Sequence, residues 1–210
     1  MDIYWGGQAM FRLKGKAQTV VLDPFDPDFT GLELPKDWQA DVVLSSHEHE
    51  DHNNIAAVTS DGTMVFSDPG EYEVKGVVIT GIASSHGEGR GTNTIFHLMF
   101  DNLNIVHLGD LGQSFLSEEQ ITQIGEVDIL LIPVGSVYTI DGKQASEIVS
   151  QLEPKVIIPM HYFIEGLKFQ LDPVDKFLKE MGAEGLIAQP KLSITKDKLP
   201  EEPQVILLAK

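Results

Sequence analysis

Three histidines and one aspartate fall within six consecutive residues of this 210-residue chain, in the pattern H-x-H-x-D-H. They are His47, His49, Asp51 and His52. Imidazole binds zinc, iron and related metals, and a carboxylate extends the choice to manganese. The alternative is a solvated loop whose acidic residues, Glu48 and Glu50, simply face water. We favour a metal site, because so dense a cluster directly after an apolar run is hard to explain by packing.

Three further side chains of ligand type each follow a run that is predicted to be a buried strand. They are His86, Asp110 and His161. Loops at strand ends bring residues from distant parts of a chain to one edge of a sheet, where functional sites commonly form. We therefore expect these three to join the H-x-H-x-D-H cluster. The two remaining histidines, His97 and His107, are expected to have structural roles, with a hydrogen bond to a ligand as the alternative for His107.

The elements that must position these side chains can be predicted from the apolar pattern. Runs of β-branched and apolar residues predict strands over residues 18–22, 41–45, 77–82, 94–100, 104–108, 128–134, 155–160 and 204–208. Helices are predicted after a capping box at Ser117 and Gln120, over residues 143–152, and from an N-cap at Asp172 to Gly182. Because no linker or repeat interrupts the chain, we expect one α/β domain over residues 1–210, with strands between helical layers.

Composition excludes several classes of site and partner. The chain has 32 acidic and 15 basic residues, a formal net charge of −17, and no cysteine. A nucleic-acid track or docking on an anionic membrane is disfavoured, because both need basic surface. Disulfides, thiolate metal sites and cysteine nucleophiles are excluded. Without a signal peptide or a long apolar run, a cytoplasmic protein acting on a small molecule is expected. A homo-oligomer stays open.

The order of these motifs resembles the metallo-β-lactamase superfamily over nearly the whole chain. PGEYEVKGV, HLGD and IPMHY are similar to the branch that contains L-ascorbate-6-phosphate lactonase and metal-dependent hydrolases of unknown substrate. The resemblance implies a four-layer αβ/βα sandwich with two divalent ions, zinc being favoured over manganese or iron. It implies one ion on His47, His49 and His86, and a second on Asp51, His52 and His161. Asp110 would bridge the ions, and Asp23 would be a structural residue near them.

Two metal ions imply hydrolysis by a water activated to hydroxide, with Asp51 and Asp110 as catalytic ligands. The expected substrate is a small, anionic ester, lactone or phosphate-bearing compound. Candidate substrate contacts are Gln8, Arg90, Tyr138 and Tyr162. Gln8 stands where this branch often has a histidine. The alternatives are a phosphodiesterase or nuclease of the same superfamily, and a non-hydrolytic metal-binding or redox protein on this fold.

Overall fold

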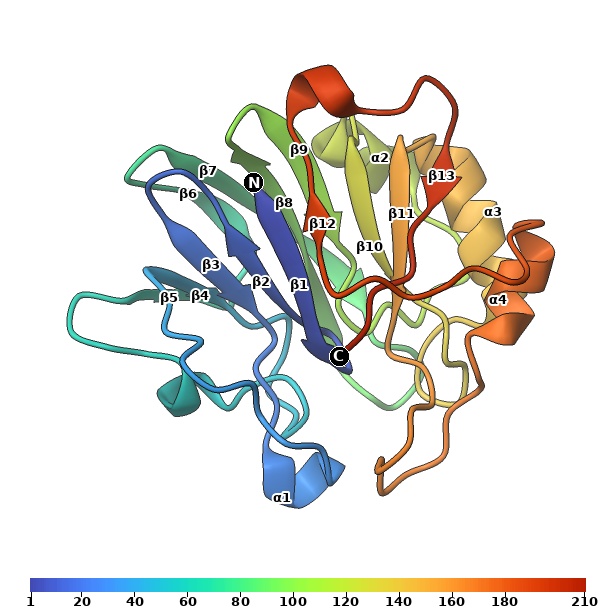
Figure 1. Cartoon of the computed structure of the whole chain (residues 1–210), viewed down its shortest axis with the longest axis horizontal. Coiled ribbons are helices and arrows are strands. Elements are labelled where there is room, and N and C mark those ends of the chain that lie inside the picture. The colour runs from blue at the N-terminus through green and yellow to red at the C-terminus, as the bar shows by residue number, and fades with distance from the viewer.

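The computed structural model describes all 210 residues, and its centre is a pair of β-sheets packed face to face (Figure 1). The first sheet has six strands in the order β12-β1-β2-β3-β4-β5. Their bounds are β1 Asp2–Gly7, β2 Met10–Lys14, β3 Thr19–Leu22, β4 Val42–Leu44, β5 Met64–Phe66 and β12 Leu192–Ser193. β3, β4 and β5 run parallel, so the loops that follow β3 and β4 leave from the same edge.

The second sheet has seven strands in the order β13-β11-β10-β9-β8-β7-β6. Their bounds are β6 Gly70–Val74, β7 Val77–Ser85, β8 Thr92–Phe100, β9 Leu103–His107, β10 Ile129–Pro133, β11 Val156–Met160 and β13 Gln204–Val205. β6 to β9 form an antiparallel meander, whereas β9, β10, β11 and β13 are parallel. All five residues of β10 and of β11 are buried, as parallel strands covered on both faces require.

Helices cover the two sheets unequally. α2 Glu118–Ile124, α3 Gly142–Leu152 and α4 Asp175–Glu180 lie beside the second sheet (Figure 1). The first sheet is covered mainly by loops, with the single turn α1 Pro27–Thr30 and the 3-10 turn Ile55–Ala57; a second 3-10 turn, Lys196–Lys198, precedes β13. The predicted α/β sandwich is confirmed. None of the helices combines the length and the apolar character that crossing a bilayer would need.

Predicted boundaries of one helix and two strands are wrong, and the first of these strands, β7, continues beyond residue 82 to Ser85. Asp172 does not cap a helix, because α4 starts at Asp175 after Val174. The groups that an N-cap would use are engaged elsewhere: the Asp172 carbonyl accepts from the Phe163 N–H (3.0 Å), and its carboxylate pairs with Lys176 Nζ (2.8 Å). The last strand ends at Val205, after which Leu208 makes only an isolated bridge to Gln189. The capping box of Ser117 and Gln120 and the helix over residues 143–152 are confirmed.

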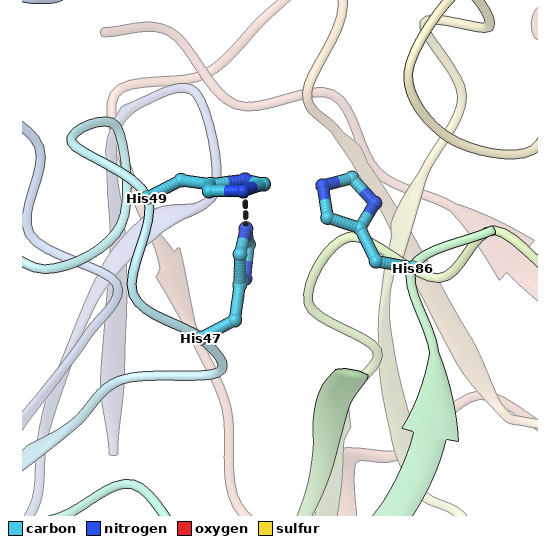
Figure 2. Close-up of side chains that lie close together, drawn as sticks. All are labelled: His47, His49 and His86. Atoms are coloured by element: carbon cyan, nitrogen blue, oxygen red, sulfur yellow. Dashed lines mark hydrogen bonds between the residues drawn. The ribbon is translucent and has the colours of Figure 1, made fainter. Parts of the chain in front are cut away.

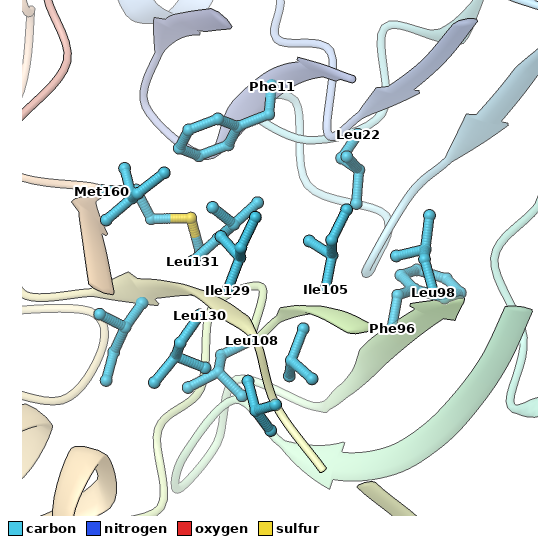
Figure 3. Close-up of a cluster of buried hydrophobic side chains, with 14 of the residues drawn as sticks. Phe11, Leu22, Phe96, Leu98, Ile105, Leu108, Ile129, Leu130, Leu131 and Met160 are labelled. Atoms are coloured by element: carbon cyan, nitrogen blue, oxygen red, sulfur yellow. The ribbon is translucent and has the colours of Figure 1, made fainter. Parts of the chain in front are cut away.

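The main core lies between the two sheets. Figure 3 shows Phe11 and Leu22 of the first sheet facing Ile105, Leu131 and Met160 of the second. All five side chains are fully buried within one cluster of 44 buried hydrophobic residues. Because interiors of this kind are close-packed, the sheets hold their ends in a fixed relation to each other. The loops at those ends carry the predicted ligands.

The packing of Phe11 can be tested by truncation. Phe11→Ala removes a fully buried ring between the sheets, and we expect a loss of about 3–5 kcal/mol in the free energy of unfolding, measured by urea denaturation. Phe115→Ala is the matched control, because Phe115 is 67% exposed and its removal should change stability little. Equal losses for the two variants would contradict the proposed core.

Candidate metal centre

All seven predicted ligands gather at one edge of the sandwich. The cluster of His47, His49, Asp51 and His52 lies in the loop after β4, and His86 follows β7. Asp110 and His161 follow β9 and β11. The antiparallel steps from β7 to β8 and from β8 to β9 leave β7 parallel to β9 and β11, so these three strands end at the same side. Both sheets therefore contribute side chains to one site.

His47, His49 and His86 form the first group of ligand atoms. His47 Nε2 lies 3.0 Å from His49 Nδ1, and the ring of His86 approaches from the other sheet, with its centroid 4.7 Å from that of His47 (Figure 2). One ligand atom from each residue fits within 4.8 Å of the others. Three converging imidazoles are a donor set that zinc and iron accept.

Asp51, His52, Asp110 and His161 form the second group. His52 Nε2 lies 3.5 Å from Asp51 Oδ2 and 3.2 Å from Asp110 Oδ1. Asp110 Oδ2 is 3.4 Å from His161 Nε2 and also 3.5 Å from His86 Nε2 of the first group. The carboxylate of Asp110 thus lies between the two groups, which is the position of a bridging ligand.

Several buried atoms in both groups have no hydrogen-bond partner, which fits metal ions as their partners. These atoms are His52 Nε2, His86 Nδ1, Asp110 Oδ1 and both ring nitrogens of His161. Buried polar atoms are paired in the great majority of cases, so a cluster of unpaired donors and acceptors requires an explanation. All are ligand types for a divalent cation.

Electrostatics favour the metal-binding forms of His47, His86, Asp51 and Asp110. Burial, with the neighbouring His52, lowers the pKa of His47 to about 3, and burial also lowers the pKa of His86. These imidazoles are therefore neutral near pH 7 and can donate a lone pair. Burial disfavours charge on Asp51 and Asp110, yet the histidines around them outweigh it, and the pKa of each carboxyl lies well below its usual value. Both remain carboxylates.

Asp23 orients one histidine in each of the two groups through hydrogen bonds. Its Oδ2 accepts hydrogen bonds from His52 Nδ1 (2.8 Å) and from the Ser46 hydroxyl (2.7 Å), and its Oδ1 accepts from the Ser46 N–H (2.7 Å). The Ser46 hydroxyl lies 2.9 Å from His47 Nδ1. Since that hydroxyl donates to Asp23, its lone pair can accept from His47 Nδ1–H. Nε2 of His47 and of His52 then faces the metal groups.

Asp110 and His161 are held by close approaches of backbone. Asn93 Oδ1 accepts a hydrogen bond from the Asp110 N–H (2.9 Å). Gly109, at φ +56°, permits this arrangement, because a Cβ there would lie 2.3 Å from Asn93 Oδ1. Gly135 likewise permits the close approach of the His161 backbone, because a Cβ at position 135 would lie 2.0 Å from the His161 carbonyl oxygen. His161 itself has φ +49°, a strained conformation for a residue with a side chain.

The structure brings three of the four predicted substrate contacts to the site. Gln8 is buried, and its Nε2 lies 3.4 Å from Asp51 Oδ2 while its Oε1 has no partner. Arg90 and Tyr138 line a cavity of about 410 Å³ above Asp51 and Asp110. Tyr162 does not reach this cavity, because its ring is buried against Trp5 with 4.9 Å between the centroids. The predicted substrate contact is therefore wrong, although Tyr162 is next to His161 in the sequence.

Besides Glu50 of the H-x-H-x-D-H loop, sequence reasoning missed three residues of this cavity, namely Phe29, Lys168 and Phe169. They lie in the α1 turn and in the loop after β11, and neither segment has a motif that would indicate a binding site. The predicted structural role of His107 agrees with its position: it is fully buried, and its Nε2 lies 2.9 Å from the Ala9 carbonyl. His97 lies on β8, with Nε2 3.3 Å from Asn104 Oδ1, and belongs to neither ligand group.

Known proteins resemble the chain in both sequence and fold. Residues 2–161 match the family model of a beta-lactamase superfamily domain. A UPF0173 metal-dependent hydrolase of Thermoplasma acidophilum is 32% identical over 189 residues, which cover 77% of this chain and 83% of the relative. A crystal structure from Thermotoga maritima, assigned as a Zn-dependent hydrolase of the metallo-β-lactamase superfamily, is 39% identical with a TM-score of 0.80, covering 99% of this chain and 97% of that one.

A more distant structure shares only the fold. CmlA, a diiron β-hydroxylase from Streptomyces venezuelae, is 16% identical with a TM-score of 0.61, over 79% of this chain and 45% of that one. The same fold therefore occurs in a protein that is named as a hydroxylase and not as a hydrolase. The fold alone does not determine the chemistry.

The support from Asp23 predicts an effect on metal affinity. Asp23→Asn removes the charge that holds His52 and Ser46, and we expect zinc affinity to fall about 10- to 100-fold in competition with a chromophoric chelator. Asp128→Asn is the control, because Asp128 is also buried but pairs with Lys196 (2.8 Å), outside both groups. That variant should lose stability and keep its zinc affinity. Wild-type affinity in Asp23→Asn would contradict the role assigned to Asp23.

The protonation states of His47 and His52 should differ in the metal-free protein. Burial disfavours charge on His52, but the carboxylates around it, first of all Asp110, outweigh burial and raise its pKa well above the usual value. We expect ¹⁵N NMR of the imidazoles at pH 7.5 to show His52 protonated at both nitrogens. His47, with its pKa lowered to about 3, should stay neutral when the pH falls to 5. A neutral His52 at pH 7.5 would contradict this electrostatic description.

Proposed function

The chain belongs to the metallo-β-lactamase superfamily and is a metal-dependent hydrolase, and on that premise we propose that it hydrolyses a small, anionic ester, lactone or phosphate-bearing substrate at two divalent metal ions. The observation that carries the proposal is the position of Asp110. Its Oδ2 lies 3.5 Å from His86 Nε2 and 3.4 Å from His161 Nε2, between two separate groups of ligand atoms. A single-ion site would not need a carboxylate at that place.

Two divalent ions, when bound, would lower the pKa of a water molecule between them and stabilise negative charge on the substrate oxygen. The protein's own residues set the geometry. Asp110 holds both groups at one spacing, and Asp51 stays ionised beside the Gln8 amide. Arg90 and Lys168 line the cavity above the centre and offer positive charge to an anionic substrate.

The donor set supports zinc, with manganese or iron as alternatives. Five imidazoles and two carboxylates contain no sulfur, and the first group is purely nitrogen. Borderline metals prefer imidazole, whereas manganese prefers oxygen. The Thermotoga maritima relative is named as zinc-dependent, which agrees with this preference. A nuclease is the less favoured function, because a surface with net charge −17 repels a polyanion outside the metal centre.

Metal content and activity test the proposal. Elemental analysis should give about two zinc, manganese or iron ions per chain. A panel of lactones, phosphodiesters and thioesters, run with zinc and with manganese, should reveal hydrolysis that His49→Ala and Asp110→Ala reduce by at least about 100-fold, with folding retained on circular dichroism. His97→Ala is the control, since His97 lies outside both groups, and its activity should remain. A protein without affinity for any of these metals, or activity that survives both ligand variants, would contradict the proposal.

A further inference from the structure

Three aromatic side chains form a continuous wall beside the metal centre. Phe29 and Phe169 have ring centroids 5.6 Å apart, and Phe169 and Tyr138 are 5.9 Å apart in an edge-to-face arrangement. All three line the cavity of about 410 Å³ whose floor includes His49, Asp51, His86 and Asp110. We call Phe29, Phe169 and Tyr138 the aromatic wall. Each ring remains partly exposed, and Phe29 is 44% exposed.

The wall is built from three distant segments that contact one another. The α1 turn carries Phe29, the loop after β11 carries Phe169, and both extend from the same end of the molecule (Figure 1). The Lys168 N–H donates to the Thr30 carbonyl (2.9 Å), and Lys168 Nζ donates to the Asp28 carbonyl (2.6 Å). These bonds place Phe169 beside Phe29. The wall is therefore a product of tertiary structure and not a chance run of apolar residues.

Positive charge lies at both ends of the wall. The guanidinium of Arg90 stacks on the Tyr138 ring, 4.7 Å from its centroid, and donates to the Val137 carbonyl (3.2 Å). Lys168, next to Phe169, lines the same cavity. Glu50 is the one acidic lining residue that belongs to neither ligand group. An apolar surface flanked by two cations is suited to a ligand that is itself apolar and anionic.

We infer that the substrate carries a flat, apolar group attached to its anionic part, with the flat group packed on the aromatic wall and the anion near Arg90 and Lys168. This inference rests on the proposed function for the position of the reacting group, and it narrows the substrate class from any small anion to an aryl-bearing one. Exposed aromatic rings that line a cavity gain most from a planar partner, because ring stacking and edge contacts add to the burial of apolar area. A short, fully polar substrate would leave the wall unused.

Binding of phosphonates to the zinc-loaded protein tests the inference without requiring turnover. Benzylphosphonate, cyclohexylmethylphosphonate and methylphosphonate share one anionic group, and isothermal titration should show benzylphosphonate binding roughly tenfold more tightly than methylphosphonate. The cyclohexyl compound should bind less tightly than the benzyl compound. Phe169→Ala should remove the benzyl preference and leave methylphosphonate binding unchanged. Phe163→Ala is the control, because Phe163 is an exposed phenylalanine in the same loop as Phe169 but does not line the cavity.

The roles of Arg90 and Lys168 in binding the anionic group can be tested by separate variants. Arg90→Met should weaken all three phosphonates several-fold, whereas Lys143→Met, on the exposed side of α3, should not. Lys168→Met should weaken all three as well, and it should also reduce the benzyl preference, because it removes the Nζ bond to Asp28 that helps to place Phe169. Phe29→Ala gives a second test of the wall if Phe169→Ala does not fold. Equal affinity for the benzyl and methyl compounds, or an equal effect of Phe163→Ala and Phe169→Ala, would overturn the inference. If the benzyl preference is found but no panel substrate is hydrolysed, the proposed function fails and the wall stands. If a panel substrate is hydrolysed but the benzyl compound is not preferred, the proposed function stands and the inference about the aromatic wall fails.

Discussion

The hydrogen bonds to the buried carboxylate of Asp23 are the interactions on which the metal centre depends. A charge fully removed from water is costly unless hydrogen bonds and opposite charges compensate for it. Here the Ser46 backbone, the Ser46 hydroxyl and the His52 ring all donate to it, and His107 Nδ1 lies 4.0 Å away. Burial raises the pKa of Asp23, but these neighbouring histidines outweigh burial and keep the pKa below its usual value. The same bonds orient His52 directly and His47 through Ser46, so one side chain sets ligands in both groups.

Three residues of the centre also have a left-handed backbone conformation. Gln8, Asp23 and His161 all have φ between +44° and +50°, although none is glycine. Such conformations cost free energy and persist only where the surroundings over-determine them. Here the close-packed sheets provide that constraint: the Gln8 carbonyl accepts from the His161 N–H (3.1 Å), and the Asp23 N–H donates to the Leu44 carbonyl (2.9 Å). The strained residues thus tie the ends of both sheets together around the ligands.

Rigidity and substrate contact are assigned to different parts of the molecule. The predicted ligands are mostly buried and follow strands of the two sheets, whereas the aromatic wall and its two cations lie in the α1 turn and in more exposed parts of loops. A fixed centre suits metal chemistry, because the spacing of the ligands must not change. Loops suit recognition, because their side chains can differ without disturbing the sandwich.

The local sequence determined much of the centre. The density of H-x-H-x-D-H, together with His86, Asp110 and His161 at strand ends, was enough to predict which seven side chains gather at this edge, because imidazole and carboxylate at the ends of buried strands have few other uses. The capping box of Ser117 and Gln120 and most of the apolar strands were readable for the same reason: their signals lie within a few residues. Tertiary structure decided the rest. Asp172 does not start α4, because its carbonyl bonds to the Phe163 N–H and its carboxylate pairs with Lys176. Tyr162 packs inward against Trp5. Phe29, Lys168 and Phe169 meet only because the α1 turn and the loop after β11 are hydrogen-bonded across about two thirds of the chain, and no local pattern records a contact between segments so far apart.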